Sequence, residues 1–159
     1  CAVFIPVAFL GGITGEMYVV GGAAMALAYA ADRSTRDVDA VFEPKTEIYA
    51  AAEEVAEELG LPSGWLNDAV KGFLASNDPS AARIFDEPGL RVFVASREIL
   101  LALKVLAHRV GEDEGDVRLL ARELRLDSAD EVLEIAERTF GDRLDTAARF
   151  FVEELFPDH

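Results

Sequence analysis

The sequence predicts an α+β fold, in which a small mixed sheet flanked by helices is followed by a C-terminal layer of helices. Short apolar runs of strand type alternate with helix-type segments as far as residue 95, and from residue 96 onward only helical periodicity remains. The chain has 159 residues, of which 51% are apolar, and this is enough for one compact core. We therefore expect a single domain over residues 1–159, with a sheet-containing core at 17–95 and a mainly helical part at 96–159.

The first part of the chain is expected to alternate strands and helices. Apolar and alanine positions recur at helical spacing between glutamates before Gly60 and Pro62, which indicates an amphipathic helix that ends there. Two apolar runs flank Asp86-Glu-Pro-Gly89 and predict a hairpin, whose second strand we expect beside the strand at 37–42. In chain order, the expected elements are a strand at 17–20, a helix at 23–31, a strand at 37–42, the amphipathic helix at 47–59, a short helix or turn at 65–74, a loop at 77–80, and hairpin strands at 84–85 and 90–95.

The second part is expected to contain helices only. Ser96 is a suitable N-cap for the first of them. Asp113 or its neighbour opens the next, and Ser128 with Glu131 has the spacing of a capping box. The expected helices span 97–110, about 113–124, a segment that starts at 128, and 145–155.

The most informative segment joins a glycine turn to a pair of acids. Gly21-Gly22 follows an apolar strand, so its backbone amides can approach a ligand without side-chain obstruction, and the helix after it can receive a triphosphate at its N-terminus. Asp37 and Asp39 are two residues apart on a strand, which places both carboxylates on one face. Two such carboxylates suit Mg²⁺ or Mn²⁺, which bridge to substrate phosphates.

This segment resembles the nucleotidyltransferase superfamily built on the DNA polymerase beta core, whose signature is a Gly-Gly or Gly-Ser turn followed by Asp-x-Asp on the next strand. The stretches 18–42 and 65–73 are similar to an uncharacterised bacterial family of such domains, related to the nucleotidyltransferase toxins of toxin–antitoxin and abortive-infection systems. The resemblance runs from about residue 17 to the C-terminus. It implies a nucleotidyltransferase-like sheet and an enzyme that moves a nucleoside monophosphate from an NTP to a hydroxyl acceptor.

The resemblance also implies further site residues. Many members place a third carboxylate on a neighbouring strand, but the run at 90–95 contains no acid. In the toxin-like relatives a lysine on the following helix and a later aspartate belong to the active centre, and Lys104 with Asp113 or Asp116 matches them by order and context. Lys104 would neutralise phosphate charge, and Arg109, about a turn onward, would assist. Arg33, Thr35 and Arg36 are further candidates for contact with the triphosphate.

Each candidate also has a purely structural interpretation. Arg33 and Arg36 would be loop cations, and Thr35 would cap the turn before the strand. Lys104 would be a helix lysine that extends to solvent, and the acids at 112–116 would complement a helix dipole. Trp65 is expected in the core, while Asn67 and Asp68 either brace their loop or line the acceptor pocket.

Composition limits the partners and the compartment. Thirty acidic and fifteen basic residues give a formal net charge of −15, which repels polyanions at long range. One cysteine cannot form an internal disulfide, so a cytoplasmic location is expected. The apolar residues 1–10 are too few to span a membrane and are expected to be packed.

The predicted reaction therefore leaves its acceptor open among RNA ends, a protein side chain and a small-molecule hydroxyl. Two other classes of function stay open as well. In the first, the chain is a degenerate module that binds nucleotide without chemistry, and the absence of an acid in the strand at 90–95 favours it. Alternatively, it would be an interaction protein of a toxin–antitoxin pair, with an acidic surface that binds a basic partner.

Overall fold

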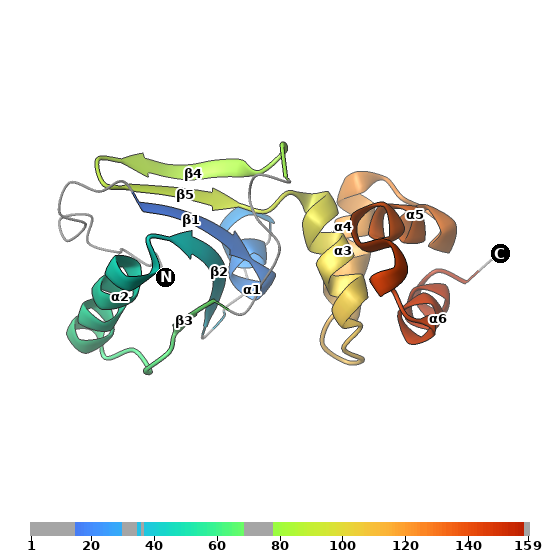
Figure 1. Ribbon diagram of the computed structural model, residues 1–159. Coiled ribbons are helices and arrows are strands. Elements are labelled where there is room, and N and C mark those ends of the chain that lie inside the picture. The colour runs from blue at the N-terminus through green and yellow to red at the C-terminus, as the bar shows by residue number, and fades with distance from the viewer. Residues whose placement is uncertain (1–14, 30–34, 36, 69–77, 158–159) are drawn as a thin grey trace. The chain divides into compact units, whose positions relative to one another are not determined.

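The computed structural model describes residues 15–29, 35, 37–68 and 78–157 (Figure 1). The chain divides into two compact units, Cys1–Ala95 and Ser96–His159. The first contains the sheet and the second is helical, so the predicted α+β class is confirmed. The predicted packing of residues 1–10 lies outside the described residues. Among the described residues, no helix has both the length and the apolar surface needed to cross a bilayer.

The first unit is built on a five-stranded mixed sheet. Its strands are β1 (Gly15–Val20), β2 (Val38–Glu43), β3 (Leu66–Asn67), β4 (Ala82–Glu87) and β5 (Leu90–Val94). They lie in the order β3-β2-β1-β5-β4. The central strand β1 runs antiparallel to β2 and parallel to β5, and β4 forms the predicted hairpin with β5.

Two expectations about the sheet were wrong. The strand β5 lies beside β1 instead of beside the acid-bearing β2, and its continuation is fixed by a hydrogen bond from the Ala95 amide to the Val19 carbonyl. Residues 17–20 are all buried. This burial is expected for a central strand, which has neighbours on both sides. The segment after Trp65 begins with the short strand β3 instead of a helix or turn, and residues 69–74 of that expectation lie outside the described residues. Two residues are too few to show a strand period in sequence.

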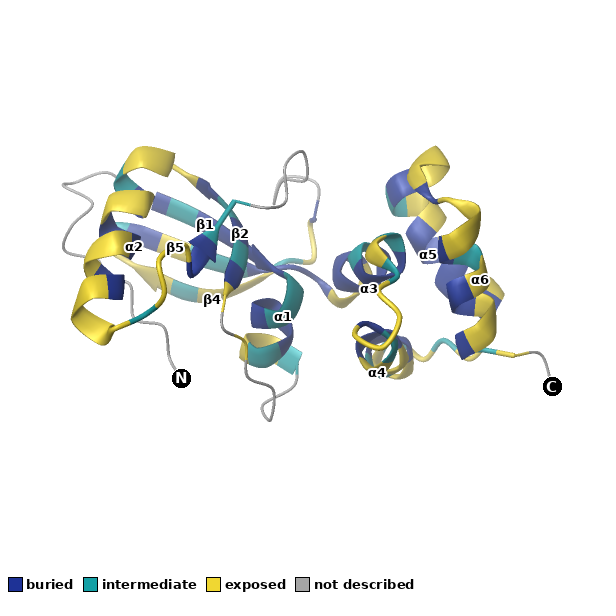
Figure 2. Ribbon diagram, turned by 90° about the horizontal axis from the view of Figure 1, so that it is seen from below, coloured by how far each residue is buried: buried dark blue, intermediate teal, exposed yellow. Residues whose placement is uncertain are grey.

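The helix α2 (Lys45–Leu59) packs on β2 and confirms the predicted amphipathic segment. Figure 2 shows buried residues along one side of this helix and exposed residues along the other. The ring of Tyr49 meets Phe42 edge-on, with centroids 4.9 Å apart. Gly60 ends the helix in the left-handed conformation, with φ +66°. Trp65 is a core residue, as predicted, because only 4% of it is exposed and its indole donates to the Ala52 carbonyl at 2.9 Å.

The predicted helix at 23–31 begins earlier than expected. A short helix α1 (Gly21–Ala24) continues as the π-helical turn η2 (Met25–Tyr29). Alanines at 23 and 24 and Met25 are buried in it, and the Tyr29 hydroxyl donates to the Ala95 carbonyl at 2.9 Å. The expected helix end at 30–31 falls outside the described residues.

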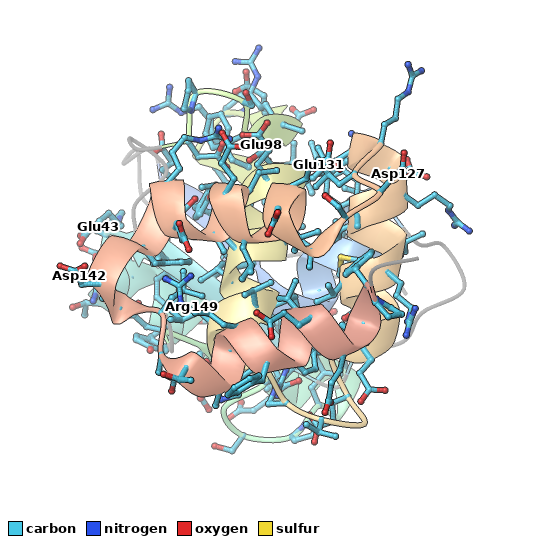
Figure 3. The ribbon with its side chains drawn as sticks, turned by 90° about the vertical axis from the view of Figure 1, so that its right-hand side faces the viewer. Glu43, Glu98, Asp127, Glu131, Asp142 and Arg149 are labelled. Atoms are coloured by element: carbon cyan, nitrogen blue, oxygen red, sulfur yellow. The ribbon has the colours of Figure 1, made fainter. Side chains whose placement is uncertain are left out.

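The second unit confirms the predicted helices. They are α3 (Arg97–Ala107), α4 (Glu114–Leu124), α5 (Ala129–Phe140), the 3₁₀ turn η4 (Gly141–Arg143) and α6 (Thr146–Leu155). Ser96 caps α3 by accepting from the Ile99 amide, and Ser128 and Glu131 form the predicted capping box. The helix α3 ends before the expected residue 110, since His108 is left-handed with φ 36°. Glu98 and Glu131 are exposed on these helices, whereas Arg149 on α6 forms an ion pair with Glu137 on α5 (Figure 3).

Candidate functional site

The glycine turn lies directly against the second predicted acid. Gly21 follows β1, and the last residue of β1, Val20, pairs with Asp39 on β2. Gly21 has φ +63°, a conformation that favours glycine, and a Cβ added there would lie 2.9 Å from the Asp39 Oδ2 atom. The absent side chain thus leaves room for the carboxylate. A backbone turn and a carboxylate meet at this end of the sheet, as the motif predicted.

The second glycine and the first acid are linked by a threonine. A Cβ on Gly22 would lie 3.4 Å from the Thr35 hydroxyl oxygen. That hydroxyl donates to the Asp37 carbonyl at 2.9 Å and lies 3.3 Å from the Asp37 carboxylate. Thr35 therefore braces the turn before β2, which agrees with its structural interpretation. It also joins the two parts of the motif, because the same hydroxyl borders Gly22.

The two acids differ in their surroundings. Asp39 lies within β2 and is half-buried, whereas Asp37 precedes the strand and is exposed. Arg33 and Arg36, the predicted phosphate contacts, fall outside the described residues. The structure thus brings together Gly21, Gly22, Thr35, Asp37 and Asp39, which all belong to the first unit.

Asn67, for which the sequence left loop bracing and the acceptor pocket open, is a neighbour of Asp39 in the sheet. It pairs with Asp39 in the parallel register of β2 and β3, so the two side chains leave the same face of the sheet. Its Oδ1 atom is buried and has no hydrogen-bond partner in the part of the chain that the structure describes. The next residue, Asp68, forms an ion pair with Lys45. Asp68 therefore braces its loop, and only the unrecognised strand β3 could have shown that Asn67 borders Asp39.

A buried tyrosine lies on the same face of the sheet. Tyr18 is two residues before Val20 on β1, and its hydroxyl donates to Asp78 Oδ2 at 2.7 Å. Both residues are buried, at 2% and 4% exposure. Burial and the neighbouring carboxylate raise the pKa of Tyr18 above its usual value. The phenol therefore stays a neutral donor, which holds the residue at position 78 against the sheet.

The other predicted residues form a buried ionic cluster in the second unit. The Lys104 ammonium on α3 lies 2.6 Å from Asp113 Oδ1 and 2.8 Å from Asp116 Oδ2. Arg109 donates to both carboxylate oxygens of Asp113, from Nε to Oδ2 at 3.0 Å and from Nη2 to Oδ1 at 3.1 Å. Lys104, Asp113 and Asp116 are exposed by 4%, 0% and 5%, so Lys104 does not extend to solvent. The cluster joins α3 to the start of α4, and a role for Lys104 in catalysis stays a prediction.

The charges of this cluster are balanced. Although burial raises the pKa of Asp113, hydrogen bonds from Arg109 and Lys104 outweigh it and hold that pKa below its usual value. Asp113 also occupies the N-cap position of α4, but its carboxylate makes no capping bond to the helix because both oxygens bind the cations. Lys104 and its two buried acids therefore link α3 to the start of α4, and the more exposed Arg109 pairs with Glu112 as well as with Asp113.

The donor set in the first unit suits a cation that keeps other ligands. Among the described residues, no group of three or more His, Cys, Asp or Glu side chains is placed to hold a metal ion. Magnesium commonly takes one or two carboxylates and completes its shell with water and substrate phosphates. Asp37 and Asp39, two carboxylates beside a glycine turn, would fit this mode of binding.

Comparisons with known proteins identify no relative of this chain. No protein-family model matches it, and searches among curated proteins and solved structures also give no match. The assignment of function therefore depends on the geometry at the end of β1 and the start of β2.

Proposed function

We propose that the chain is a divalent-cation-dependent nucleotidyltransferase, which moves a nucleoside monophosphate from an NTP to a hydroxyl acceptor. The observation that carries the proposal is the position of the Asp39 carboxylate beside the left-handed Gly21, where it fills the space that a side chain on residue 21 would need. It places backbone amides, which bind phosphate oxygens, next to an acid that binds hard cations.

Each residue of the site has a defined part in the proposed reaction. The amides of Gly21 and Gly22 hold the β and γ phosphates of the NTP, and the Asp37 and Asp39 carboxylates hold Mg²⁺ or Mn²⁺. When bound, the cation offsets the charge that develops on the α phosphate and on pyrophosphate. The acceptor oxygen forms a bond to the α phosphorus, the bond from that phosphorus to the bridging oxygen breaks, and pyrophosphate leaves. A carboxylate of the site accepts the proton of the acceptor hydroxyl.

The direct test is transfer of label from nucleotide. The full chain is incubated with each of the four NTPs, labelled at the α phosphate, with Mg²⁺ or Mn²⁺ and a cell extract. We expect one fraction of the extract, as RNA, protein or small molecules, to gain label, with release of pyrophosphate and dependence on the cation. Absence of both NTP binding by calorimetry and label transfer would contradict the proposal.

Gly21→Ala is expected to disable the site without unfolding the unit. The left-handed φ costs an alanine about 1–2 kcal/mol. In addition, its Cβ would meet Asp39 Oδ2 at 2.9 Å, so that carboxylate must move. We therefore expect a loss of stability of about 1–2 kcal/mol and a loss of NTP affinity of at least about tenfold. Urea unfolding followed by Trp65 fluorescence and calorimetry with NTP measure the two effects.

Gly60→Ala is the matched control. Gly60 has φ +66°, almost the same as Gly21, but no atom of the described residues lies within 4 Å of a Cβ added there. The Gly60→Ala variant therefore has the backbone strain but no clash, and its NTP affinity should equal that of the wild type. If both variants lose affinity equally, the space beside Asp39 is not the reason for the glycine.

A second candidate function is nucleotide binding without transfer. The strand β5 (Leu90–Val94) contains no acid, so the third carboxylate of comparable sites is missing from it. An NTP held at Gly21 would then act as a signal. Calorimetric NTP affinity together with no release of pyrophosphate, across RNA, protein and small-molecule acceptors, would favour this candidate over the enzyme.

A further inference from the structure

Asn67 is paired in the sheet with Asp39, the proposed cation ligand, and carries a buried amide oxygen. This Oδ1 atom is buried, and no donor within the described ranges of the chain reaches it. Buried carbonyl oxygens are normally satisfied, because leaving one without a partner destabilises the fold. An orphaned acceptor at a ligand site is therefore a sign that the ligand supplies the missing interaction.

The register of the sheet places this oxygen beside Asp39. Asp39 pairs with Asn67 across β2 and β3, and with Val20 at the end of β1 on its other side. Paired residues on adjacent strands are about 4.8 Å apart and point to one face. Two oxygen acceptors are thus neighbours on the face that Gly21 borders. Two acceptors cannot hydrogen-bond to each other, but they can share a cation.

We propose that Asn67 is the third oxygen ligand of the divalent-cation site, with its side-chain carbonyl bound to the same ion as Asp39. This inference rests on the proposed function. An amide oxygen is an accepted ligand of hard divalent cations. The site then takes its third ligand from β3, on the opposite side of β2 from β1 and β5. This accounts for a strand β5 that lacks an acid.

The melting temperature of the Asn67→Leu variant distinguishes a ligand role for Asn67 from a structural one, because the two roles predict changes of opposite sign. Leucine has nearly the same shape as asparagine but no acceptor, so Asn67→Leu removes the orphaned oxygen. In the full chain with EDTA, we expect this variant to melt about 2–4 °C above the wild type. If Asn67 braced the loop instead, Asn67→Leu would melt lower, and that result would overturn the inference.

Binding of Mn²⁺ alone, measured by electron paramagnetic resonance of the free ion, gives the second readout. We expect the dissociation constant to rise at least about tenfold in Asn67→Leu, which is the loss of about 1.4 kcal/mol of ligand interaction. Asn67→Asp should bind Mn²⁺ as tightly as the wild type or more tightly, because a carboxylate is a stronger ligand. The control is Asp68→Asn, which changes the next residue, bound to Lys45, and should leave Mn²⁺ affinity unchanged.

The same titrations distinguish failure of this inference from failure of the proposed function. If Asn67→Leu binds Mn²⁺ as the wild type does while Asp39→Asn binds it weakly, Asn67 is not a ligand and the nucleotidyltransferase site stands. If the wild type does not bind Mn²⁺, or if Asp39→Asn leaves the affinity unchanged, the cation site itself is wrong and both proposals fall.

Discussion

Replacing Asp37 and Asp39 together with alanine is expected to abolish cation-dependent turnover of NTP by the chain. The two carboxylates are the acids next to the glycine turn, one through Thr35 and the other through Gly21. A cation at such a site contributes several kcal/mol of charge stabilisation, and each 1.4 kcal/mol changes a rate tenfold. We therefore expect turnover to fall by at least about 1,000-fold. Release of pyrophosphate at saturating Mg²⁺ measures it.

The control for this variant removes the same charge from the same sheet. Asp86→Ala with Glu87→Ala deletes two acids at the exposed hairpin end of β4. Both double variants lose two negative charges, so an effect of net charge alone would be equal in the two. We expect the control to retain wild-type turnover. Equal activity of the Asp37 and Asp39 double variant and the wild type would reject the proposed metal site.

The fold was predictable where structure depends on residues that are close together in the sequence. The capping box at Ser128, the N-cap at Ser96 and the left-handed Gly60 are each set by one or two residues and their helix, and all three are present. The error about the neighbour of β5 has a different origin. Apolar periodicity shows that a segment is a strand but carries no information about its partner, which depends on contacts across the whole sheet.

Only the part of the candidate site formed by residues 21–39, which are near each other in the sequence, was predictable. Spacing gave the glycine turn and the acid pair, and the contact of Gly21 with Asp39 agrees with both. The pairing of Asn67 with Asp39 was not predictable, because it depends on the two-residue strand β3. Lys104 pairs with both of the acids between which the resemblance left a choice, but the sequence could not show that their charges would be buried against each other.

Lys104→Met is expected to destabilise the second unit far more than the loss of a surface ion pair would. Methionine keeps the length of the side chain but removes the cation, which leaves Asp113 and Asp116 buried beside an apolar group. Removing one partner of a buried ion pair costs about 3–5 kcal/mol, a large share of the roughly 5–15 kcal/mol that holds a domain folded. The change in the free energy of unfolding is measured with urea and the circular dichroism of the helices.

Arg138→Met is the matched control on the same unit. Arg138 pairs with Glu98 at 3.3 Å, but both side chains are more than half exposed, at 59% and 54%. Such surface pairs contribute about 0–1 kcal/mol, so this variant should unfold almost as the wild type does. An equal, small loss in both variants would show that the cluster at Lys104 does not hold α3 and α4 together.

Acid should reduce the difference between Lys104→Met and the wild type. The cations hold the folded pKa of Asp113 below its usual value, so its contribution to stability is complete above the unfolded pKa of about 3.9 and is lost as the pH falls through the folded pKa. In Lys104→Met one of these cations is gone and the folded pKa of Asp113 rises, so the variant loses less on acidification. The two free energies of unfolding should therefore differ most near pH 7 and converge toward pH 3. A difference that stays constant with pH would mean that Lys104 stabilises the unit through its alkyl chain, not through its charge.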